Sequence, residues 1–485
     1  MNPLERIDHW AAVAPAATAH LSGDRKLTFG ELGAHANALA AHLLERFGED
    51  RAPVAVLGHR EPEMLIAFIG VAKSGRPYIP IDTALPQERI NHILAIAKPA
   101  LVLTPHEIAK LSELGKSAPP RRLQPGDTFY IIFTSGSSGT PKGITITLSC
   151  LEHFIGWMLR EQKFIESGEI FLNQAPFSFD LSVMDLYCSL VTGGTLLSIS
   201  RDLLASPKLL YRALANSNIT TWISTPSFVE MCLVERQFNR ALLQRVRRFL
   251  FCGEILLPQT ARLLLDRFPG ADVWNMYGPT EATVATTSVR IDRDILEKYP
   301  ALPVGRPMPG TEVFVTDENR KILPTGSRGE IVIKGPNVSP AYLARPDLTA
   351  ARFFQEGNQR AYRTGDWGRF RDGLLFFEGR IDNQIKLNGY RIELGDLEAN
   401  LRALPMVRDA AVIPVMKNGK VQSLAGFVVP NADFKVADPG LTTTLRERLR
   451  ERLPAYMLPR KFVILDTFPM TANGKVDRSK LAESL

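Results

Sequence analysis

The chain has 485 residues, a formal net charge of +7, 45% hydrophobic residues and 22% charged residues. These values are close to those of globular proteins, and they exclude a disordered, fibrous or membrane-embedded chain. The length predicts about two to four domains or subdomains. The N-terminus lacks the basic and apolar regions of a secretory signal, which predicts a cytoplasmic protein. The best apolar stretch, Met64–Ala72, is about half of the roughly 20 residues that span a bilayer, so we expect no membrane insertion.

Helical patterns alternate with short apolar strands through the first part of the chain. The predicted helices are Phe29–Phe47, Met64–Lys73, Leu242–Phe249 and Pro258–Phe268. The predicted strands are Pro53–Leu57, Tyr130–Phe133, Thr220–Ile223 and Val273–Met276. This alternation predicts an α/β fold with a mostly parallel sheet and helices on its faces.

From about Val304 the pattern changes to short strands broken by glycine and proline, which predicts a small β-rich subdomain over 304–381. Its strands are expected at Glu312–Thr316, Gly329–Lys334 and Leu374–Glu378. A compact α+β pattern follows, with helices at Leu394–Leu404 and Thr442–Leu453 and strands at Asp409–Val415 and Ser423–Val429. We therefore place a domain boundary at Asp382, which separates domain 1–381 from domain 382–485.

A segment rich in glycine and hydroxyl residues follows the strand Tyr130–Phe133. It contains Thr134, Ser135, Gly136, Ser137, Ser138, Gly139, Thr140 and Lys142. Glycines allow backbone N–H groups to approach a ligand, hydroxyls add donors, and the lysine neutralises phosphate charge. The spacing is not that of a Walker loop. A flexible surface loop is the first alternative.

A serine hydrolase is the second alternative for this segment, but its GxSxG motif is absent. All eight histidines lie in the first third of the chain, so a serine nucleophile would need its base from there. The four cysteines, Cys150, Cys188, Cys232 and Cys252, have no CxxC spacing, which predicts reduced buried thiols rather than disulfides or a zinc site.

Two later motifs carry further candidate ligands. In Asn275–Glu281, Tyr277 is suited to stack on a base, Thr280 to bind a phosphate oxygen, and Glu281 to hold Mg²⁺. A Gly-Pro turn with an incidental acid is the alternative. In the second motif, Tyr362–Asp366, the carboxylate of Asp366 is suited to bind ribose hydroxyls, although aspartate is also a common turn residue.

Two basic residues are further candidates. Arg380 presents a fork of donors for phosphate, although a solvated arginine is its commoner role. Lys475 follows Asn473-Gly474, a pair that on its own predicts a hairpin turn with an exposed lysine.

Taken in this order, the motifs resemble those of the adenylate-forming superfamily of acyl-CoA synthetases, luciferases and peptide-synthetase adenylation domains. They read TSGSSGTPKG, NMYGPTE, YRTGD, GRIDNQIKLNGYRIE and NGKVDR, and the likeness covers nearly the whole chain. It implies a large N-terminal domain of αβαβα-type subdomains with a small β-barrel-like subdomain, and a mobile α+β C-terminal domain that rotates about a hinge at Asp382. ATP and Mg²⁺ are the implied cofactors.

The resemblance also implies residue roles. Lys475 would bridge the substrate carboxylate and the α-phosphate, and Arg380 would contact the ribose-phosphate side. The segment around Lys142 would hold the β- and γ-phosphates, with Thr280 on a phosphate oxygen and Glu281 on the metal. Tyr277 would stack on adenine beside Asn275, and Asp366 would hold the ribose.

Four further segments resemble the branch of the superfamily that activates D-alanine for a phosphopantetheinylated carrier protein in the D-alanylation of teichoic acid or a similar polymer. They are Asn173–Asp185, Ser224–Phe228, Phe251–Glu254 and Leu453–Arg460. Asp180 would pair with the substrate ammonium, with a helix N-cap as its alternative. Cys252 would shape the pocket around the methyl group, with a merely buried thiol as its alternative.

Some functions stay open at this point. Adenylation of L-alanine, glycine, serine or proline for a peptide-synthetase-like pathway is the nearest rival, and a non-catalytic scaffold is another. Met276 and Ser138 stand where related enzymes often carry threonine, and Met276 in particular leaves the amino acid in doubt. From Asn383 onward the chain has 16 basic and 11 acidic residues without interleaved aromatic platforms, so we expect no nucleic acid and favour an acidic protein partner or a solvated surface.

Overall fold

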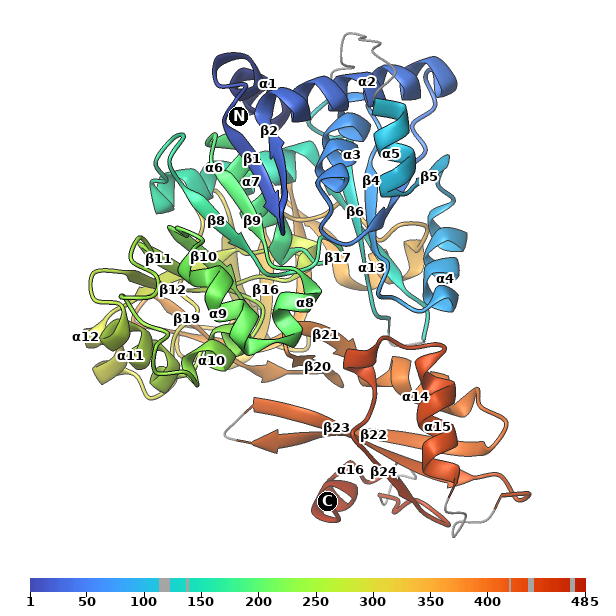
Figure 1. Cartoon of the computed structure of the whole chain (residues 1–485). Coiled ribbons are helices and arrows are strands. Elements are labelled where there is room, and N and C mark those ends of the chain that lie inside the picture. Colours follow the sequence, from blue (N-terminus) through green and yellow to red (C-terminus); the bar gives the residue numbers. More distant parts are fainter. Residues whose placement is uncertain (113–122, 137–138, 418–419, 435–439, 472–475) are drawn as a thin grey trace. The chain divides into compact units, whose positions relative to one another are not determined.

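The computed structural model describes residues 1–485 except 113–122, 137–138, 418–419, 435–439 and 472–475. It divides into two compact units, whose elements are labelled in Figure 1. The first unit comprises Met1–Asp82, Ala97–Ile132 and Gly143–Gly379, and the second comprises Thr83–Ile96, Phe133–Lys142 and Arg380–Leu485. Asp382 lies near the start of the last segment, and its role as a hinge stays a prediction.

A nine-stranded sheet forms one layer of the first unit. Its strands are β1 (Thr18–Ser22), β2 (Arg25–Thr28), β8 (Ile170–Asn173), β9 (Thr195–Ser198), β10 (Thr221–Ser224), β11 (Arg248–Phe251), β12 (Asp272–Tyr277), β13 (Thr287–Ile291) and β14 (Arg306–Pro307). They lie in the order β14-β13-β12-β11-β10-β8-β9-β1-β2, and the strands from β12 to β1 in this order are parallel. The α/β class and the mostly parallel sheet predicted from the sequence are confirmed.

The predicted helix Leu242–Phe249 is wrong. Arg248–Phe251 forms strand β11 between β10 and β12, and turns precede it. The side chains of Leu243, Val246 and Phe249 are all buried, and their spacing of three residues imitates a helical face. A central strand of a parallel sheet is buried on both faces, so it lacks the alternation that would have distinguished it from a helix.

A second sheet of the first unit has five strands in the order β5-β3-β4-β6-β7. They are β3 (Val54–Gly58), β4 (Tyr78–Asp82), β5 (Leu101–Leu103), β6 (Thr128–Thr134) and β7 (Lys142–Thr147). Helix α2 (Phe29–Phe47) begins at a capping box in which Thr28 and Glu31 exchange hydrogen bonds. Helix α3 (Pro62–Lys73) is buried on every side. No helix among the described residues is long and apolar enough to cross a membrane.

The predicted β-rich region forms a third sheet in the order β15-β16-β18-β17, with β19 paired to β18. Its elements are β15 (Glu312–Thr316), β16 (Gly329–Lys334), α13 (Pro346–Arg352), β17 (Phe353–Glu356), β18 (Gln359–Arg371) and β19 (Leu374–Arg380). The predicted strands at Glu312–Thr316 and Gly329–Lys334 are confirmed to the residue.

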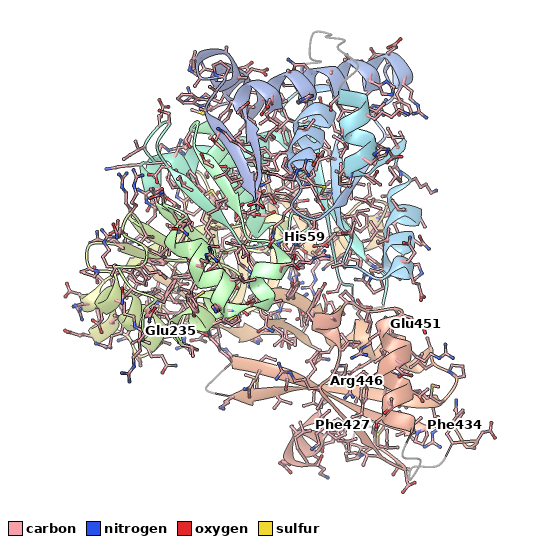
Figure 2. All side chains as sticks on the ribbon, in the orientation of Figure 1. His59, Glu235, Phe427, Phe434, Arg446 and Glu451 are labelled. Carbon is pink, nitrogen blue, oxygen red and sulfur yellow. The ribbon has the colours of Figure 1, made fainter. Side chains whose placement is uncertain are left out.

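The second unit has its own core. Its last segment contains β20 (Gln384–Leu387), β21 (Tyr390–Glu393), α14 (Leu394–Arg402), β22 (Val407–Lys417), β23 (Lys420–Pro430), α15 (Leu441–Arg450), β24 (Lys461–Ile464) and α16 (Arg478–Glu483). Leucines of α14 and α15 pack together in one buried cluster. Figure 2 labels Arg446 on α15 and Glu451, the C-cap residue of that helix.

A buried polar chain crosses the nine-stranded sheet. The His20 ring donates from Nε2 to the Ser198 hydroxyl at 2.8 Å, and that hydroxyl donates to Asn173 Oδ1 at 2.8 Å. Asn173 in turn donates to Asp185 Oδ1 at 3.1 Å and to the Ala175 carbonyl at 3.0 Å. Burial lowers the pKa of His20 to about 3 and raises the pKa of Asp185. His20 is therefore neutral near pH 7.

We expect the neutral His20 to make folding sensitive to acid. Its pKa in the folded chain lies below the 6.5 of an unfolded histidine, so the unfolded chain binds more protons between these values. The free energy of unfolding should fall as the pH falls, by about 2 kcal/mol from this residue between pH 7.5 and pH 5. Urea unfolding of the wild type and of His20→Gln at both pH values measures the difference.

The comparison between the two proteins removes the contribution of Asp185, whose raised pKa acts in the opposite direction, because both proteins contain it. If the two proteins lost the same free energy of unfolding between pH 7.5 and pH 5, His20 would not be buried in its neutral form.

Candidate active site

Two predicted nucleotide residues of the first unit are in direct contact. Tyr277 ends β12, and Asp366 lies in β18 of the β-rich sheet. The Tyr277 hydroxyl donates to Asp366 Oδ2 at 2.6 Å, and both side chains are buried. The Tyr277 ring centroid lies 6.1 Å from that of Phe377. The fold therefore places an aromatic face and a carboxylate side by side, which suits a base and its attached sugar.

The part of β18 that carries Asp366 is held by Glu330 of β16. Glu330 accepts a hydrogen bond from the Gly365 N–H at 3.0 Å and another from Arg363 Nε at 2.8 Å. Gly365 has a φ of 72°, a left-handed conformation that glycine adopts without strain. The Asp366 N–H donates to the Thr364 hydroxyl at 3.0 Å. Glu330 was missed from the sequence because it belongs to no motif.

Glu281, the predicted metal ligand, is completely buried in the short helix η1 (Thr280–Ala282). Its Oε1 accepts a hydrogen bond from the Tyr342 hydroxyl at 2.8 Å. Among the described residues, no group of three or more His, Cys, Asp or Glu side chains could hold a metal by itself. Mg²⁺ usually takes one or two carboxylates and completes its shell with phosphate oxygens and water, so Glu281 fits Mg²⁺ that arrives with a nucleotide.

Asp180 and Cys252 follow the carboxyl ends of β8 and β11, at the edge where open α/β sheets bind ligands. Asp180 is the N-cap residue of helix α7 (Leu181–Val191), as the alternative predicts, but its side chain makes no capping hydrogen bond. Cys252 is buried, and its thiol donates to the Val284 carbonyl at 3.7 Å.

Tyr130 is an additional polar group near Asp180. Its hydroxyl is buried and has no hydrogen-bond partner among the described residues. Burial and, to a smaller degree, the charges of Tyr78 and Asp180 raise the pKa of Tyr130 well above its usual value. The hydroxyl therefore keeps its proton at neutral pH and can donate a hydrogen bond. Its place in a predicted strand was its only signal in the sequence.

The predicted phosphate segment belongs to the second unit. Ser135 Oγ donates to the Arg391 carbonyl at 2.9 Å and accepts from the Glu393 N–H at 3.2 Å. Lys142 Nζ lies 4.0 Å from Glu393 Oε1. The Thr134 hydroxyl is buried and without a hydrogen-bond partner in the described part of the chain. Thr140 is exposed.

The glycines of this segment are needed for its tight turn. A Cβ on Gly136 would lie 2.2 Å from the Thr140 carbonyl oxygen, and Gly139 has a φ of 84°. Ser137, Ser138 and Lys475, which the sequence also assigns to the site, lie outside the described residues.

The remaining predicted residues have structural partners. Arg380 forms two hydrogen bonds to the Asp382 carboxylate, from Nε at 2.9 Å and from Nη2 at 2.7 Å. Asn275 is buried in β12, and its amide donates to the Pro303 carbonyl at 2.8 Å. This N–H of the Asn275 amide is therefore already used in a hydrogen bond within the protein.

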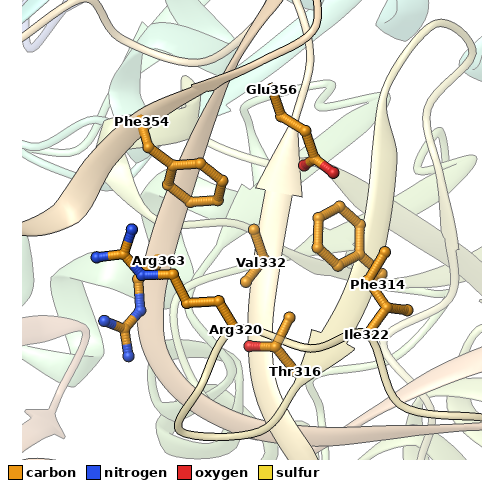
Figure 3. Close-up of a pocket in the computed structure, with 8 residues that line it drawn as sticks. All are labelled: Phe314, Thr316, Arg320, Ile322, Val332, Phe354, Glu356 and Arg363. Carbon is orange, nitrogen blue, oxygen red and sulfur yellow. The ribbon is translucent and has the colours of Figure 1, made fainter.

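A small hollow of about 50 Å³ lies on the β-rich sheet (Figure 3). Its lining consists of Phe314, Thr316, Arg320, Ile322, Val332, Phe354, Glu356 and Arg363. None of the residues predicted from the sequence lines it. The candidate site therefore rests on the residues at the sheet edges and not on this hollow.

Comparison with known proteins identifies the family. Residues 7–343 match the model of the AMP-binding enzyme family, and residues 396–475 match the model of the AMP-binding enzyme C-terminal domain. The chain is 44% identical to the D-alanine–D-alanyl carrier protein ligase of Bacillus cereus (strain B4264), over 99% of both chains. The ligase of the same name from Bacillus thuringiensis (strain Al Hakam) matches with the same identity and coverage.

Solved structures share the fold. The Vibrio cholerae adenylation domain AlmE in complex with glycyl-adenosine-5'-phosphate superposes with a TM-score of 0.86 at 22% identity, over 99% of this chain and 98% of that one. PA1221, a protein with adenylation and PCP domains, superposes with a TM-score of 0.85 at 26% identity, over 100% and 84%. The chain belongs to the AMP-binding enzyme family, which is the adenylate-forming superfamily that its motifs resemble.

Proposed function

We propose that this protein uses ATP to activate D-alanine as D-alanyl-AMP and transfers the D-alanyl group to the phosphopantetheine thiol of a carrier protein. The observation that carries the proposal is the 44% identity, over 99% of both chains, to ligases with that activity in their name. The D-alanyl group would then serve the D-alanylation of teichoic acid or a similar polymer. Because the reaction consumes ATP, we place it in the cytoplasm.

In the first half-reaction, a carboxylate oxygen of D-alanine attacks the α-phosphorus of ATP, and pyrophosphate leaves with the bonding electrons. Negative charge builds up on the α-phosphate oxygens, and positioned cations and N–H donors stabilise it. We assign this work to Lys475 and Thr280, and the β- and γ-phosphates to Lys142 and the hydroxyls of its segment. Arg380 would contact the ribose-phosphate side once it releases Asp382.

The nucleoside is assigned to Tyr277 and Asp366, whose mutual hydrogen bond fixes the orientation of both side chains. The adenine would stack on the Tyr277 ring, and the ribose hydroxyls would bind the Asp366 carboxylate. Mg²⁺ bound at Glu281 would neutralise phosphate charge. Burial and the Tyr342 hydroxyl hold the Glu281 carboxylate in a single orientation.

The amino acid is assigned to Asp180 and Cys252. A carboxylate carries the charge opposite to that of an α-ammonium group, and a pair of the two compensates for the cost of burying either charge. The Cys252 thiol would contact the methyl group. A pocket separates substrates that differ by one methyl group only by about 1 to 3 kcal/mol, so we expect some activity with glycine and serine.

In the second half-reaction, the carrier thiol gives up its proton, its sulfur attacks the D-alanyl carbonyl carbon, and AMP leaves with the electrons of the acyl–phosphate bond. We assign the change between the two half-reactions to a rotation of the C-terminal domain about Asp382. A carrier protein presents this thiol on a phosphopantetheine arm, so the partner is the phosphopantetheinylated form.

The direct test of the complete function is covalent loading of a carrier. The protein is incubated with ATP, labelled D-alanine and a D-alanyl carrier protein with or without its phosphopantetheine group. We expect a label that hydroxylamine releases, only on the phosphopantetheinylated carrier. Formation of D-alanyl-AMP without any loading of that carrier would contradict the transfer step, and preferential loading with L-alanine, glycine, serine or proline would favour a peptide-synthetase-like role.

A further inference from the structure

The loop between β12 and β13, residues 278–286, has an unusual backbone. Thr283 and Val284 are consecutive residues with φ values of 57° and 69°. Residues other than glycine rarely adopt this left-handed backbone conformation, and a β-branched valine is strained in it. Such a conformation persists only where the surroundings enforce it, and it is found most often at functional sites. A specific set of contacts must therefore hold this loop.

Asn337 supplies these contacts from another part of the chain, the segment between β16 and α13. Its Nδ2 donates to the Ala282 carbonyl at 3.0 Å and to the Thr286 hydroxyl at 3.1 Å. Its backbone carbonyl accepts from the Thr283 hydroxyl at 2.8 Å. The Asn337 side chain is completely buried. One residue thus holds the loop on both sides of its left-handed pair.

A further hydrogen bond fixes the orientation of the Asn337 amide. The Thr311 hydroxyl donates to Asn337 Oδ1 at 2.8 Å, so the amide nitrogen must point toward the loop. Both N–H groups and the carbonyl oxygen of the amide are therefore used. An aspartate of the same shape would turn an acceptor oxygen toward the Ala282 carbonyl, where the loop requires a donor.

The loop contains the proposed metal ligand, Glu281, and contacts the residue assigned to the substrate methyl group, Cys252. Near its start, Glu281 is the proposed metal ligand, and its backbone carbonyl accepts from the Ser339 N–H at 2.8 Å. Near its end, the Val284 carbonyl accepts from the Cys252 thiol at 3.7 Å. The Val284 carbonyl is therefore a contact of the thiol, and the thiol is the group assigned to the substrate methyl.

We propose that Asn337 is a positioning residue that sets the amino-acid selectivity of the enzyme by holding the strained loop against Cys252. This inference rests on the proposed function, because the selectivity is read through the adenylation of amino acids. Asn337 is not one of the residues assigned to the nucleotide or to the amino acid, and the hydrogen bonds described above are all to protein groups. Its loss lets Val284 relax toward an unstrained backbone, and the wall of the methyl pocket then moves with the thiol.

The test is the ratio of kcat/KM for D-alanine to kcat/KM for glycine in pyrophosphate exchange. Both values come from one enzyme sample, so the fraction of folded protein cancels. We expect Asn337→Asp to lower the ratio by at least about fivefold, a large part of what a methyl-sized pocket can achieve. Thr311→Val removes the hydrogen bond that orients the Asn337 amide, and it should lower the ratio by a smaller factor. If Asn337→Asp does not fold, the ratio measured for Thr311→Val tests the proposal.

Thr260→Val is the matched control. Thr260 is also a buried threonine with one side-chain hydrogen bond, to Glu230 at 2.8 Å, but it lies on helix α11 (Pro258–Arg267). Its ratio should stay within about twofold of the wild type. The inference is overturned if every Asn337 and Thr311 variant that folds keeps the wild-type ratio. If the wild type prefers another amino acid, the proposed function fails, and the same variants are then judged by the ratio of that substrate to its next best.

Discussion

Replacing Asp180 with asparagine is expected to lower kcat/KM for D-alanine by about 30-fold or more, while KM for ATP changes by less than about twofold. Loss of one partner of a buried charge pair costs about 2 to 5 kcal/mol, and each 1.36 kcal/mol corresponds to a factor of ten. Asparagine keeps the size of the side chain and removes its charge. Because the Asp180 side chain makes no capping hydrogen bond to helix α7, we do not expect the substitution to loosen that helix. Pyrophosphate exchange with varied D-alanine and varied ATP separates the two KM values.

D-lactate provides the control for the Asp180 prediction, since it replaces the ammonium group with a neutral hydroxyl. The Asp180→Asn variant should use D-lactate at least as well as the wild type, because no ammonium charge is lost in that complex. The ratio of D-alanine to D-lactate activity should therefore collapse. An equal loss of activity with both substrates would show that Asp180 shapes the site without pairing with the ammonium group.

Replacing Glu281 with glutamine is expected to lower kcat for adenylation by about 100-fold and to raise the Mg²⁺ concentration required for half-maximal rate by at least about tenfold. Glutamine retains an oxygen that can accept the hydrogen bond from Tyr342, so the change is mainly one of charge. Calorimetric titration of ATP at several Mg²⁺ concentrations gives a readout that does not depend on turnover. It should show that the Mg²⁺-dependent part of ATP affinity is lost.

Tyr342→Phe is the matched variant for the Glu281 prediction. It keeps the carboxylate but removes the hydroxyl that orients it, and such supporting partners typically contribute 10- to 100-fold in metal affinity. We expect a weaker shift of the Mg²⁺ dependence in the same direction. An unchanged Mg²⁺ dependence in Glu281→Gln would mean that another group binds the metal.

Local sequence patterns predicted the secondary-structure elements whose formation depends mainly on neighbouring residues. Helix α2 was predicted to the residue from its amphipathic pattern, and in the structure its ends coincide with a capping box of Thr28 and Glu31 and with Gly48. The strand β11 was taken for a helix because burial on both faces removes the alternation that marks a strand. Its identity depends on its neighbours β10 and β12, which a local pattern does not contain.

The same distinction applies to the site. Tyr277 and Asp366 were selected because their motifs have a recognisable order, and the fold joins them by a hydrogen bond across 89 positions of the chain. Glu330, Tyr342 and Asn337 were missed, although each holds a motif residue or its loop in place. Their partners are distant in sequence, so their importance appears only once the tertiary structure brings the strands together.

Amino-acid-dependent pyrophosphate exchange tests the central claim most directly. The purified protein is assayed with ATP, Mg²⁺ and, in turn, D-alanine, L-alanine, glycine, serine and proline. We expect D-alanine to give a kcat/KM about tenfold or more above each of the others, with glycine and serine as the residual activities. Exchange dominated by L-alanine or proline, or exchange that does not depend on any amino acid, would contradict the assignment of this chain as a D-alanine-activating ligase.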